Sequence, residues 1–511
     1  MSEATTQAEP PRPVRYVSPA WWAERLQQGW SRPELRWLTA ILILAAVLRI
    51  VWVVYAAREP QELHDPTFYF FYGAQIAEGR GYRLPTLEEA LLIAPNAIEE
   101  AVERGDPLPA GEPTAYYPIG YPAALGAVFA LVKHTPIPDN LVLAGAFFNV
   151  FLGVATVALV YQVGRRLFGV GVGLLAALWL AVFPNLIFHT AAFLTETLFN
   201  FLDMAALLVL LSGSWKGRQL GRGNLLLFGA LLGLSALVRP ISLLFLPLLP
   251  IVWLVAGFGW RRALGHSAAV LAVTVAVIAP WTVRNIVVMG APIIISTNVG
   301  DNLCIGHHPG ASGHFSFADP TGADYCNFSL EPYRGLDRDE AEVRRNNDNT
   351  QSAFRFAVEN PRFELQLLSR KAWYLWNKDH NGLRAVESYE TDFFIDTDLR
   401  EVLMRGADIF FFVTISLGGL GLVAFVLPPR DPRRVFFLLA LLALAGVPLV
   451  FFSVARFHVP VMPLLVVSAA WAVLSVRELP HLLAPPRAAE GAGTEGRPSQ
   501  ARKKSRNVGR R

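Results

Sequence analysis

Acidic and aromatic side chains follow directly on the first long apolar run of the chain. Glu62, His64 and Asp65 stand at its end, in "ELHDPTFYFFYG", and the aromatics of 68–72 come next. A carboxylate at the mouth of a membrane helix can act as a general base on a nearby hydroxyl. Asp65 is therefore the candidate base, with Glu62 and His64 beside it. The alternative is that both acids are ordinary solvated loop charges, and the aromatics favour an interfacial anchor over stacking on sugar rings.

Three arginines lie at the ends of apolar runs, where an anion could meet them. They are Arg239 in "ALVRPISLL", Arg284 in "PWTVRNIVV" and Arg456 in "VARFHVPV", with His458 two residues after Arg456. The planar guanidinium fork fits a phosphate. The sequence thus predicts an anion site made by these three arginines and supported by His458. Arginines that only extend to the polar interface are the alternative.

A polar stripe interrupts the apolar run at 192–213. Glu196, Asn200 and Asp203 are spaced i, i+4 and i+7, so they share one helix face. Such a face avoids lipid. We expect Glu196, near the helix end, to hold a cation or the acceptor, and Asp203 to be structural; hydrogen bonding between helices is the alternative for the stripe.

Two tyrosines of "AYYPIGYP", Tyr117 and Tyr121, are candidates for lining a substrate pocket. Anchoring of this proline-bracketed segment at the interface explains them equally well.

The composition of the chain indicates that these residues belong to a membrane protein. Of 511 residues, 53% are hydrophobic and 17% charged, and apolar runs near the length of a bilayer crossing recur. We predict an all-α polytopic membrane protein of about ten transmembrane helices, at 36–57, 141–163, 169–188, 192–213, 223–239, 241–259, 265–281, 404–427, 434–453 and 458–476.

Basic residues alternate between successive loops as the positive-inside rule requires. The N-terminal segment, "GRRLFG", "SWKGRQLGRG", "GWRRALG", "PPRDPRRV" and the tail are all basic. This places both termini in the cytoplasm and explains the positive charge without nucleic acid. With this orientation, segment 117–135 is predicted to be a helix at the membrane interface that does not cross the bilayer. The predicted organisation is a cytoplasmic segment 1–35, a transmembrane module 36–281 with external loop 58–140, an external segment 282–403, transmembrane helices 404–476 and a basic tail 477–511.

Metal and disulfide chemistry depends on few residues. Cys304 and Cys326 are the two cysteines, and both fall in the second external segment. A disulfide and two unrelated small residues are both compatible with their spacing. A zinc site that joins them with His307 and His308 is disfavoured because no paired ligand motif accompanies them.

In their order and placement, these motifs resemble those of the C-type glycosyltransferase superfamily over residues 40–470. The resemblance is nearest to the bacterial relatives of protein O-mannosyltransferases and lipid A aminoarabinose transferases. It is carried by "ELHD", "GRGYRLP", "AYYPIGYPAAL", "FPNLIFHTAAFLTETLF", "GLSALVRPISLL", "PWTVRNIVVMGAPIIISTNVGDNLCIGHHPGASG" and "RFHVPVMP". It implies interfacial helices in the first external loop and an active site on the non-cytoplasmic face of the inner membrane.

The resemblance also implies a chemistry. The donor is a sugar on a polyprenyl phosphate, and Asp65 is the base that deprotonates an acceptor hydroxyl, with inversion at the anomeric carbon. Many relatives have a second acid beside this aspartate, whereas here the neighbours are His64 and Pro66. Arg239 and Arg456 would stabilise the leaving phosphate. Some members use a divalent metal ion, and the acceptor stays open between lipid, glycan and protein.

Two other functions fit an intramembrane charge cluster. One is a secondary transporter or flippase, which the lack of an internal repeat disfavours. The other is a polymerase or ligase of lipid-linked glycans.

Overall fold

The part of the chain that can be described is built from helices. The computed structural model describes residues 33–104, 108–133, 135, 140–212, 221–316, 326, 331–333, 335–425 and 431–475. Within these ranges the one β contact is an isolated bridge between Arg83 and Pro113. Nearly all of the predicted segment 1–35 and all of the tail 477–511 lie outside the described residues, as does most of the basic loop at 214–223.

Among the described residues, six helical segments are long and apolar enough to cross a bilayer, which confirms a polytopic membrane protein. They are α2 (Pro33–Ala56), α7 (Leu141–Phe168), α13 (Trp260–Met289), α18 with η4 (Thr397–Phe425), α19 (Pro432–Val450) and η5 with α20 (Ala455–Ser475). The other predicted runs also fall on helices, which are shorter: α8 (Val170–Ala181), α9 (Pro184–Phe188), α10 (Glu196–Leu211), α11 (Arg222–Val238), and η1 (Pro240–Leu244) with α12 (Phe245–Val255). The count of about ten spans stays a prediction.

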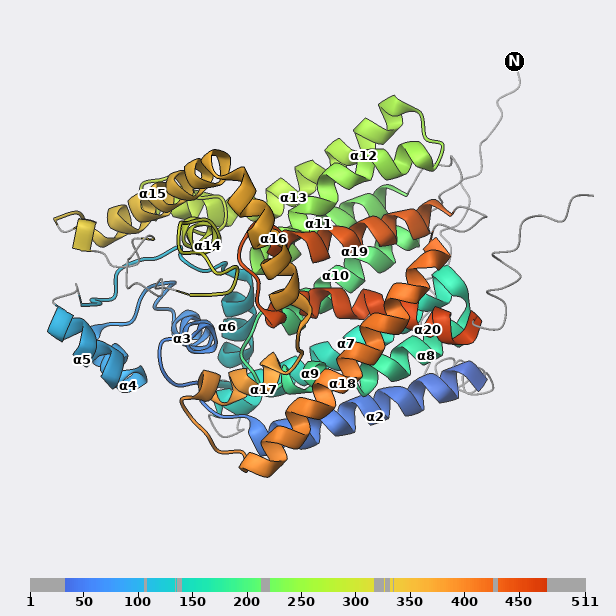
Figure 1. The fold of residues 1–511 in the computed structure, drawn as a ribbon, viewed down its shortest axis with the longest axis horizontal. Coiled ribbons are helices and arrows are strands. Elements are labelled where there is room, and N and C mark those ends of the chain that lie inside the picture. The colour runs from blue at the N-terminus through green and yellow to red at the C-terminus, as the bar shows by residue number, and fades with distance from the viewer. Residues whose placement is uncertain are drawn as a thin grey trace, which may run out of the picture. The chain divides into compact units, whose positions relative to one another are not determined.

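Close helix packing depends on small residues at the contacts. Helices α2, α7 and α8 pack on one another, and Figure 1 shows them side by side. A Cβ added at Gly173 of α8 would lie 2.7 Å from the carbonyl oxygen of Tyr161 in α7. Glycine therefore sets this spacing, as is common between membrane helices. Arg49 of α2 is buried here and donates to the carbonyl oxygens of Leu180 and Ala181 at the end of α8.

The segment 58–140, predicted to be the first external loop, contains α3 (Asp65–Ala77), α4 (Leu87–Ile93), α5 (Pro95–Arg104) and α6 (Gly120–Lys133). Helix α6 corresponds to the segment predicted to be interfacial, and it packs on α3, α7 and α11. Figure 1 shows α3 and α6 next to each other. The placement of α6 relative to the bilayer stays a prediction.

The segment 282–403, predicted to be the second external segment, contains α14 (Val299–Gly306), η2 (Glu331–Tyr333), α15 (Arg338–Glu359), α16 (Pro361–Trp376), α17 (Asn381–Val386) and η3 (Ser388–Glu390). Helix α15 ends before Pro361, as proline requires. Cys304 of α14 forms a disulfide with Cys326. Of the two alternatives for these cysteines, a disulfide or two unrelated small residues, the structure shows the disulfide.

Candidate active site

Asp65 is held by a tyrosine and an arginine from distant parts of the chain. It is the first residue of α3, where Pro66 fits the first helical turn. The Tyr117 hydroxyl donates to its Oδ1 over 2.7 Å, and Arg456 Nη1 donates to its Oδ2 over 2.6 Å. The side chain of Asp65 is about one-third exposed. The predicted base is thus an accessible carboxylate with both oxygens engaged.

Glu196 is the fully buried partner of two arginines. It begins α10, and its Oε1 accepts from Arg456 Nε at 2.5 Å and from Arg239 Nη1 at 3.0 Å. A buried carboxylate needs such partners because removal of its charge from water costs several kcal/mol. The sequence prediction that Glu196 holds a cation agrees with these contacts.

Four charges therefore form a continuous row: Asp65, Arg456, Glu196 and Arg239. They come from α3, η5 (Ala455–Val461), α10 and the junction between α11 and η1. Arg239 has an extended backbone at φ −146° and ψ 116°, which Pro240 favours in the residue before it. The α11 helix ends there, and the arginine side chain reaches Glu196.

Tyr389 is a member of the site that the sequence analysis did not find. Arg456 Nη1 donates to its hydroxyl over 3.3 Å. The backbone of Ser388, Tyr389 and Glu390 has φ values of 46°, 56° and 81°, which are unfavourable for side-chain-bearing residues. Glu387 and Glu390 flank the tyrosine in "ESYET", but no motif or spacing there distinguishes Tyr389 from an ordinary loop residue, so the sequence analysis did not single it out. Burial raises the pKa of Tyr389 to about 12, which keeps its proton available.

Tyr117 is likewise a protonated hydrogen-bond donor. Burial raises the pKa of its phenol well above the usual range, and the charge of Asp65 raises it further. The Tyr117 ring packs against Tyr69 and Phe68 of α3, with ring centroids at 5.1 and 5.6 Å. This aromatic packing fixes the hydroxyl toward Asp65.

Three predicted residues have partners outside the row of charges. Arg284 donates to the carbonyl oxygens of Thr114 and Tyr82, each over 2.7 Å. The Tyr121 hydroxyl bonds with the amide of Asn149 between α6 and α7. Glu62 accepts from Asn96 at 3.4 Å. The structure brings none of these three into contact with Asp65 or Arg456.

The two predicted histidines lie near the row but make other contacts. The His64 ring lies 5.3 Å from the Tyr389 ring, and burial lowers its pKa while Asp65 and Glu62 raise it. His458 is buried between Trp376 and Phe411. Its ring nitrogens lie 2.6 Å from the Leu375 carbonyl oxygen and 2.8 Å from Asp379 Oδ1. His458 thus anchors η5, which also carries Arg456.

The predicted second external segment, 282–403, contacts the residues directly before Tyr117. Glu342 of α15 accepts from the Thr114 hydroxyl at 2.7 Å, the Ala115 amide at 3.0 Å and the Thr297 hydroxyl at 2.6 Å. Asp301 of α14 accepts from the Tyr116 hydroxyl at 2.9 Å. The sequence analysis missed both acids, since nothing in a polar helix or a glycine-rich loop marks one carboxylate as buried.

The described residues contain no cluster of three or more His, Cys, Asp or Glu side chains that could hold a metal ion.

Part of the chain is similar to a known protein family. Residues 124–283 match the family model described as dolichyl-phosphate-mannose-protein mannosyltransferase, which confirms the resemblance predicted from the sequence. No curated protein matches the sequence.

Solved structures with a similar course of the chain include two membrane proteins. One is the oligosaccharyltransferase AglB of Archaeoglobus fulgidus, in complex with an inhibitory peptide and a dolichol-phosphate; it has 17% identity and a TM-score of 0.47, over 87% of this chain and 51% of that one. The other is ArnT of Cupriavidus metallidurans bound to undecaprenyl phosphate, with 13% identity and a TM-score of 0.41 over 87% and 62%. The chain therefore spans about half to three-fifths of these proteins.

Proposed function

We propose that this protein, whose residues 124–283 match the model of the dolichyl-phosphate-mannose-protein mannosyltransferase family, is an integral membrane glycosyltransferase. It transfers a sugar from a polyprenyl-phosphate donor to an acceptor hydroxyl at the outer face of the inner membrane, with inversion. The acceptor is a lipid, a glycan or a protein. Membrane lipids surround the spans, and nucleic acid has no part in the function.

The contact of Arg456 with both Asp65 and Glu196 is the observation that carries this proposal. It puts a carboxylate with access to solvent next to a buried cation. A transferase with a phosphate leaving group needs this pair, because one group takes a proton while the other stabilises developing negative charge.

The reaction is a single displacement in this scheme. Asp65 takes the proton of the acceptor hydroxyl as its oxygen attacks the anomeric carbon. The bond between that carbon and the phosphate oxygen breaks, and the electron pair leaves with the polyprenyl phosphate. The guanidinium groups of Arg456 and Arg239 stabilise the negative charge that develops on the leaving phosphate. Arg239 uses only Nη1 toward Glu196, so its other N–H groups can donate to phosphate oxygens.

Glu196 keeps the two arginines together when the donor binds. A phosphate competes with Asp65 for Arg456 Nη1, while Arg456 Nε stays on Glu196. The exchange frees Asp65 Oδ2 from the guanidinium, so this oxygen can accept the proton of the acceptor hydroxyl. Donor binding and activation of the base are coupled in this way.

The test compares the wild type with Asp65→Asn in lipid, using a panel of radiolabelled polyprenyl-phosphate sugars and membrane extract as the source of acceptor. We expect transfer by the wild type and its loss in the variant. Glu88→Gln is a matched control, since Glu88 is an exposed acid of the same external loop. Transfer that persists in Asp65→Asn would exclude Asp65 as the base. Uptake of a solute without any transfer would favour a transporter.

A further inference from the structure

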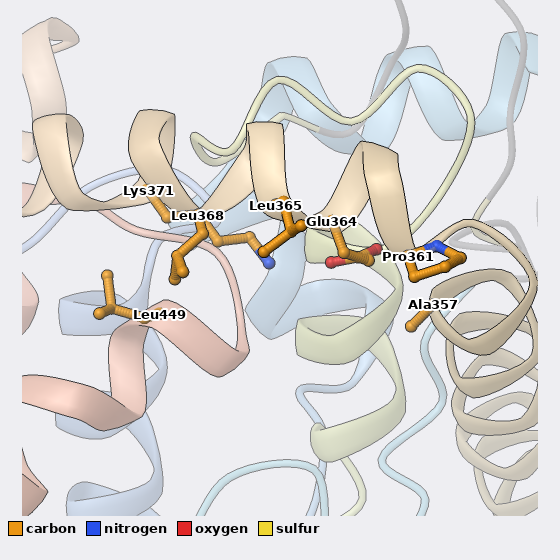
Figure 2. A pocket seen from close by; sticks show the side chains of 7 residues that line it. All are labelled: Ala357, Pro361, Glu364, Leu365, Leu368, Lys371 and Leu449. Carbon is orange, nitrogen blue, oxygen red and sulfur yellow. The ribbon is translucent and has the colours of Figure 1, made fainter.

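A pocket lies between helix α16 and the end of the membrane helix α19. It has a volume of about 430 Å³ and is lined by Ala357, Pro361, Glu364, Leu365, Leu368, Lys371 and Leu449. Figure 2 shows the Lys371 side chain extending along the pocket toward Leu365 and Glu364. The pocket shares no residue with the row of charges around Arg456.

Lys371 is the unusual member of this lining. Its residue surface is only 1% exposed, and no described residue forms a hydrogen bond or ion pair with its ammonium group. A buried charge without a partner is costly, so such a group is retained where a ligand can supply the partner. Burial lowers the pKa of Lys371 to about 8, although Glu364 raises it.

The neighbouring acid is already matched by a histidine. His307 Nδ1 lies 2.9 Å from Glu364 Oε1, and its Nε2 lies 2.5 Å from the Val450 carbonyl oxygen. The Glu364 carboxylate therefore lies against the His307 ring, and Lys371 is the one cationic residue of the pocket lining.

The walls of the pocket suit a hydrocarbon chain. Leu365 and Leu368 line it and are exposed, and Val450 beside Leu449 is exposed as well. These residues surround the last turn of α19, which as the end of a membrane-crossing helix lies at the boundary between hydrocarbon and water. Exposed leucines at this level are covered by lipid.

We propose that this pocket binds an anionic phospholipid, with the phosphate against Lys371 and an acyl chain along Leu365, Leu368 and Leu449. Basic pockets beside membrane helices bind phospholipid headgroups by the same chemistry. The site is separate from the proposed donor site and does not depend on the transferase activity.

Acetylation of Lys371 provides the test. At pH 8 about half of an amine with this pKa is neutral and reacts with acetic anhydride. The full-length protein is reconstituted in phosphatidylcholine alone or mixed with phosphatidylglycerol, and acetylation is read by mass spectrometry. Lys378, half-buried just after α16, is the internal reference. We expect phosphatidylglycerol at about ten times its dissociation constant to slow Lys371 acetylation about tenfold relative to Lys378.

Variants and free phosphate make the result decisive. Lys371→Gln should lose co-purified phosphatidylglycerol in native mass spectrometry, and Lys371→Arg should retain it. Arg370→Gln is the matched control, because Arg370 is the adjacent, exposed cation of α16. Equal acetylation in both lipid mixtures, or equal loss of lipid from Lys371→Gln and Arg370→Gln, would overturn the proposal. Protection by inorganic phosphate as strong as by the lipid would assign the pocket to a free anion.

Discussion

Arg456 connects the candidate site because its guanidinium contacts three partners at once. It binds Asp65 and Tyr389 through Nη1 and Glu196 through Nε. A lysine could not reproduce this arrangement, since a single ammonium lacks the fixed fork of N–H donors. At the scale of single residues, the geometry of the site is thus set by one arginine and the carboxylates on either side of it.

Removal of the Glu196 charge should disable the site. In Glu196→Gln the Arg456 and Arg239 guanidinium groups lose their shared buried carboxylate, and loss of one partner of a buried ion pair costs about 3–5 kcal/mol. We expect a lower melting temperature and at least about a hundredfold slower transfer.

Asp203→Asn is the control on the same helix. The Ser235 hydroxyl donates to Asp203 Oδ1, and an amide oxygen can accept the same bond. This variant should keep most of the activity. If Glu196→Gln transferred sugar at the wild-type rate, the role of Glu196 as the holder of both arginines would be wrong.

Helix α15 acts on the site at the scale of elements, without contact with Asp65. Glu342 accepts three hydrogen bonds. Two come from Thr114 and Ala115, which lie directly before Tyr117, and the third comes from the Thr297 hydroxyl. In Glu342→Gln the amide group cannot accept all three bonds, so the turn carrying Tyr117 loosens. We expect a fall in kcat of about tenfold, the effect of ~1.4 kcal/mol, with intact membrane insertion.

Glu340→Gln tests whether that effect belongs to the buried position. Glu340 lies on the same helix and is exposed, so its loss should leave the transfer rate unchanged. Equal rates for Glu342→Gln and Glu340→Gln would show that α15 does not position Tyr117.

The aromatic cluster of the first external loop makes a prediction about pH. Burial raises the pKa values of five of its tyrosines above the ordinary value: Tyr69, Tyr72, Tyr82, Tyr116 and Tyr117. The fold thus keeps phenols neutral that the unfolded chain ionises near pH 10. Their contribution to stability is complete below about pH 10 and falls as the pH rises above it.

Tyrosinate absorbance measures this cluster directly. In a titration of the folded protein, we expect these five tyrosines to ionise only together with unfolding, as followed by circular dichroism. Tyr82→Phe should reduce the amplitude of that late step by one tyrosine. Ionisation of all tyrosines before any loss of helix signal would contradict the buried cluster.

At the scale of the molecule, the sequence predicted the helices better than the contacts between them. Apolar runs mark helices through the length of a bilayer, and a stripe such as that of Glu196 marks an inward face, so both were found. Contacts between Arg456 and Asp65 join residues 391 positions apart, and no local pattern encodes such a pairing. Arg284 illustrates the limit: in the sequence it follows an apolar run much as Arg239 does, yet it lies inside α13 and binds loop carbonyls.

Orientation in the membrane is the property of the whole molecule on which the proposed function depends most. Asp65 and Arg456 can meet a donor at the outer face only if the segments 58–140 and 282–403 lie outside, as the distribution of basic residues predicts.

The two cysteines form a disulfide, so one added cysteine gives a single free thiol. In intact cells, a thiol reagent that cannot cross the membrane should label Glu88→Cys and Glu359→Cys, which are exposed in the two external segments. Arg261→Cys, exposed at the start of α13, should react only after permeabilisation. Labelling of Arg261→Cys alone in intact cells would invert the topology and place the row of charges at the cytoplasmic face, where a donor at the outer face could not reach it.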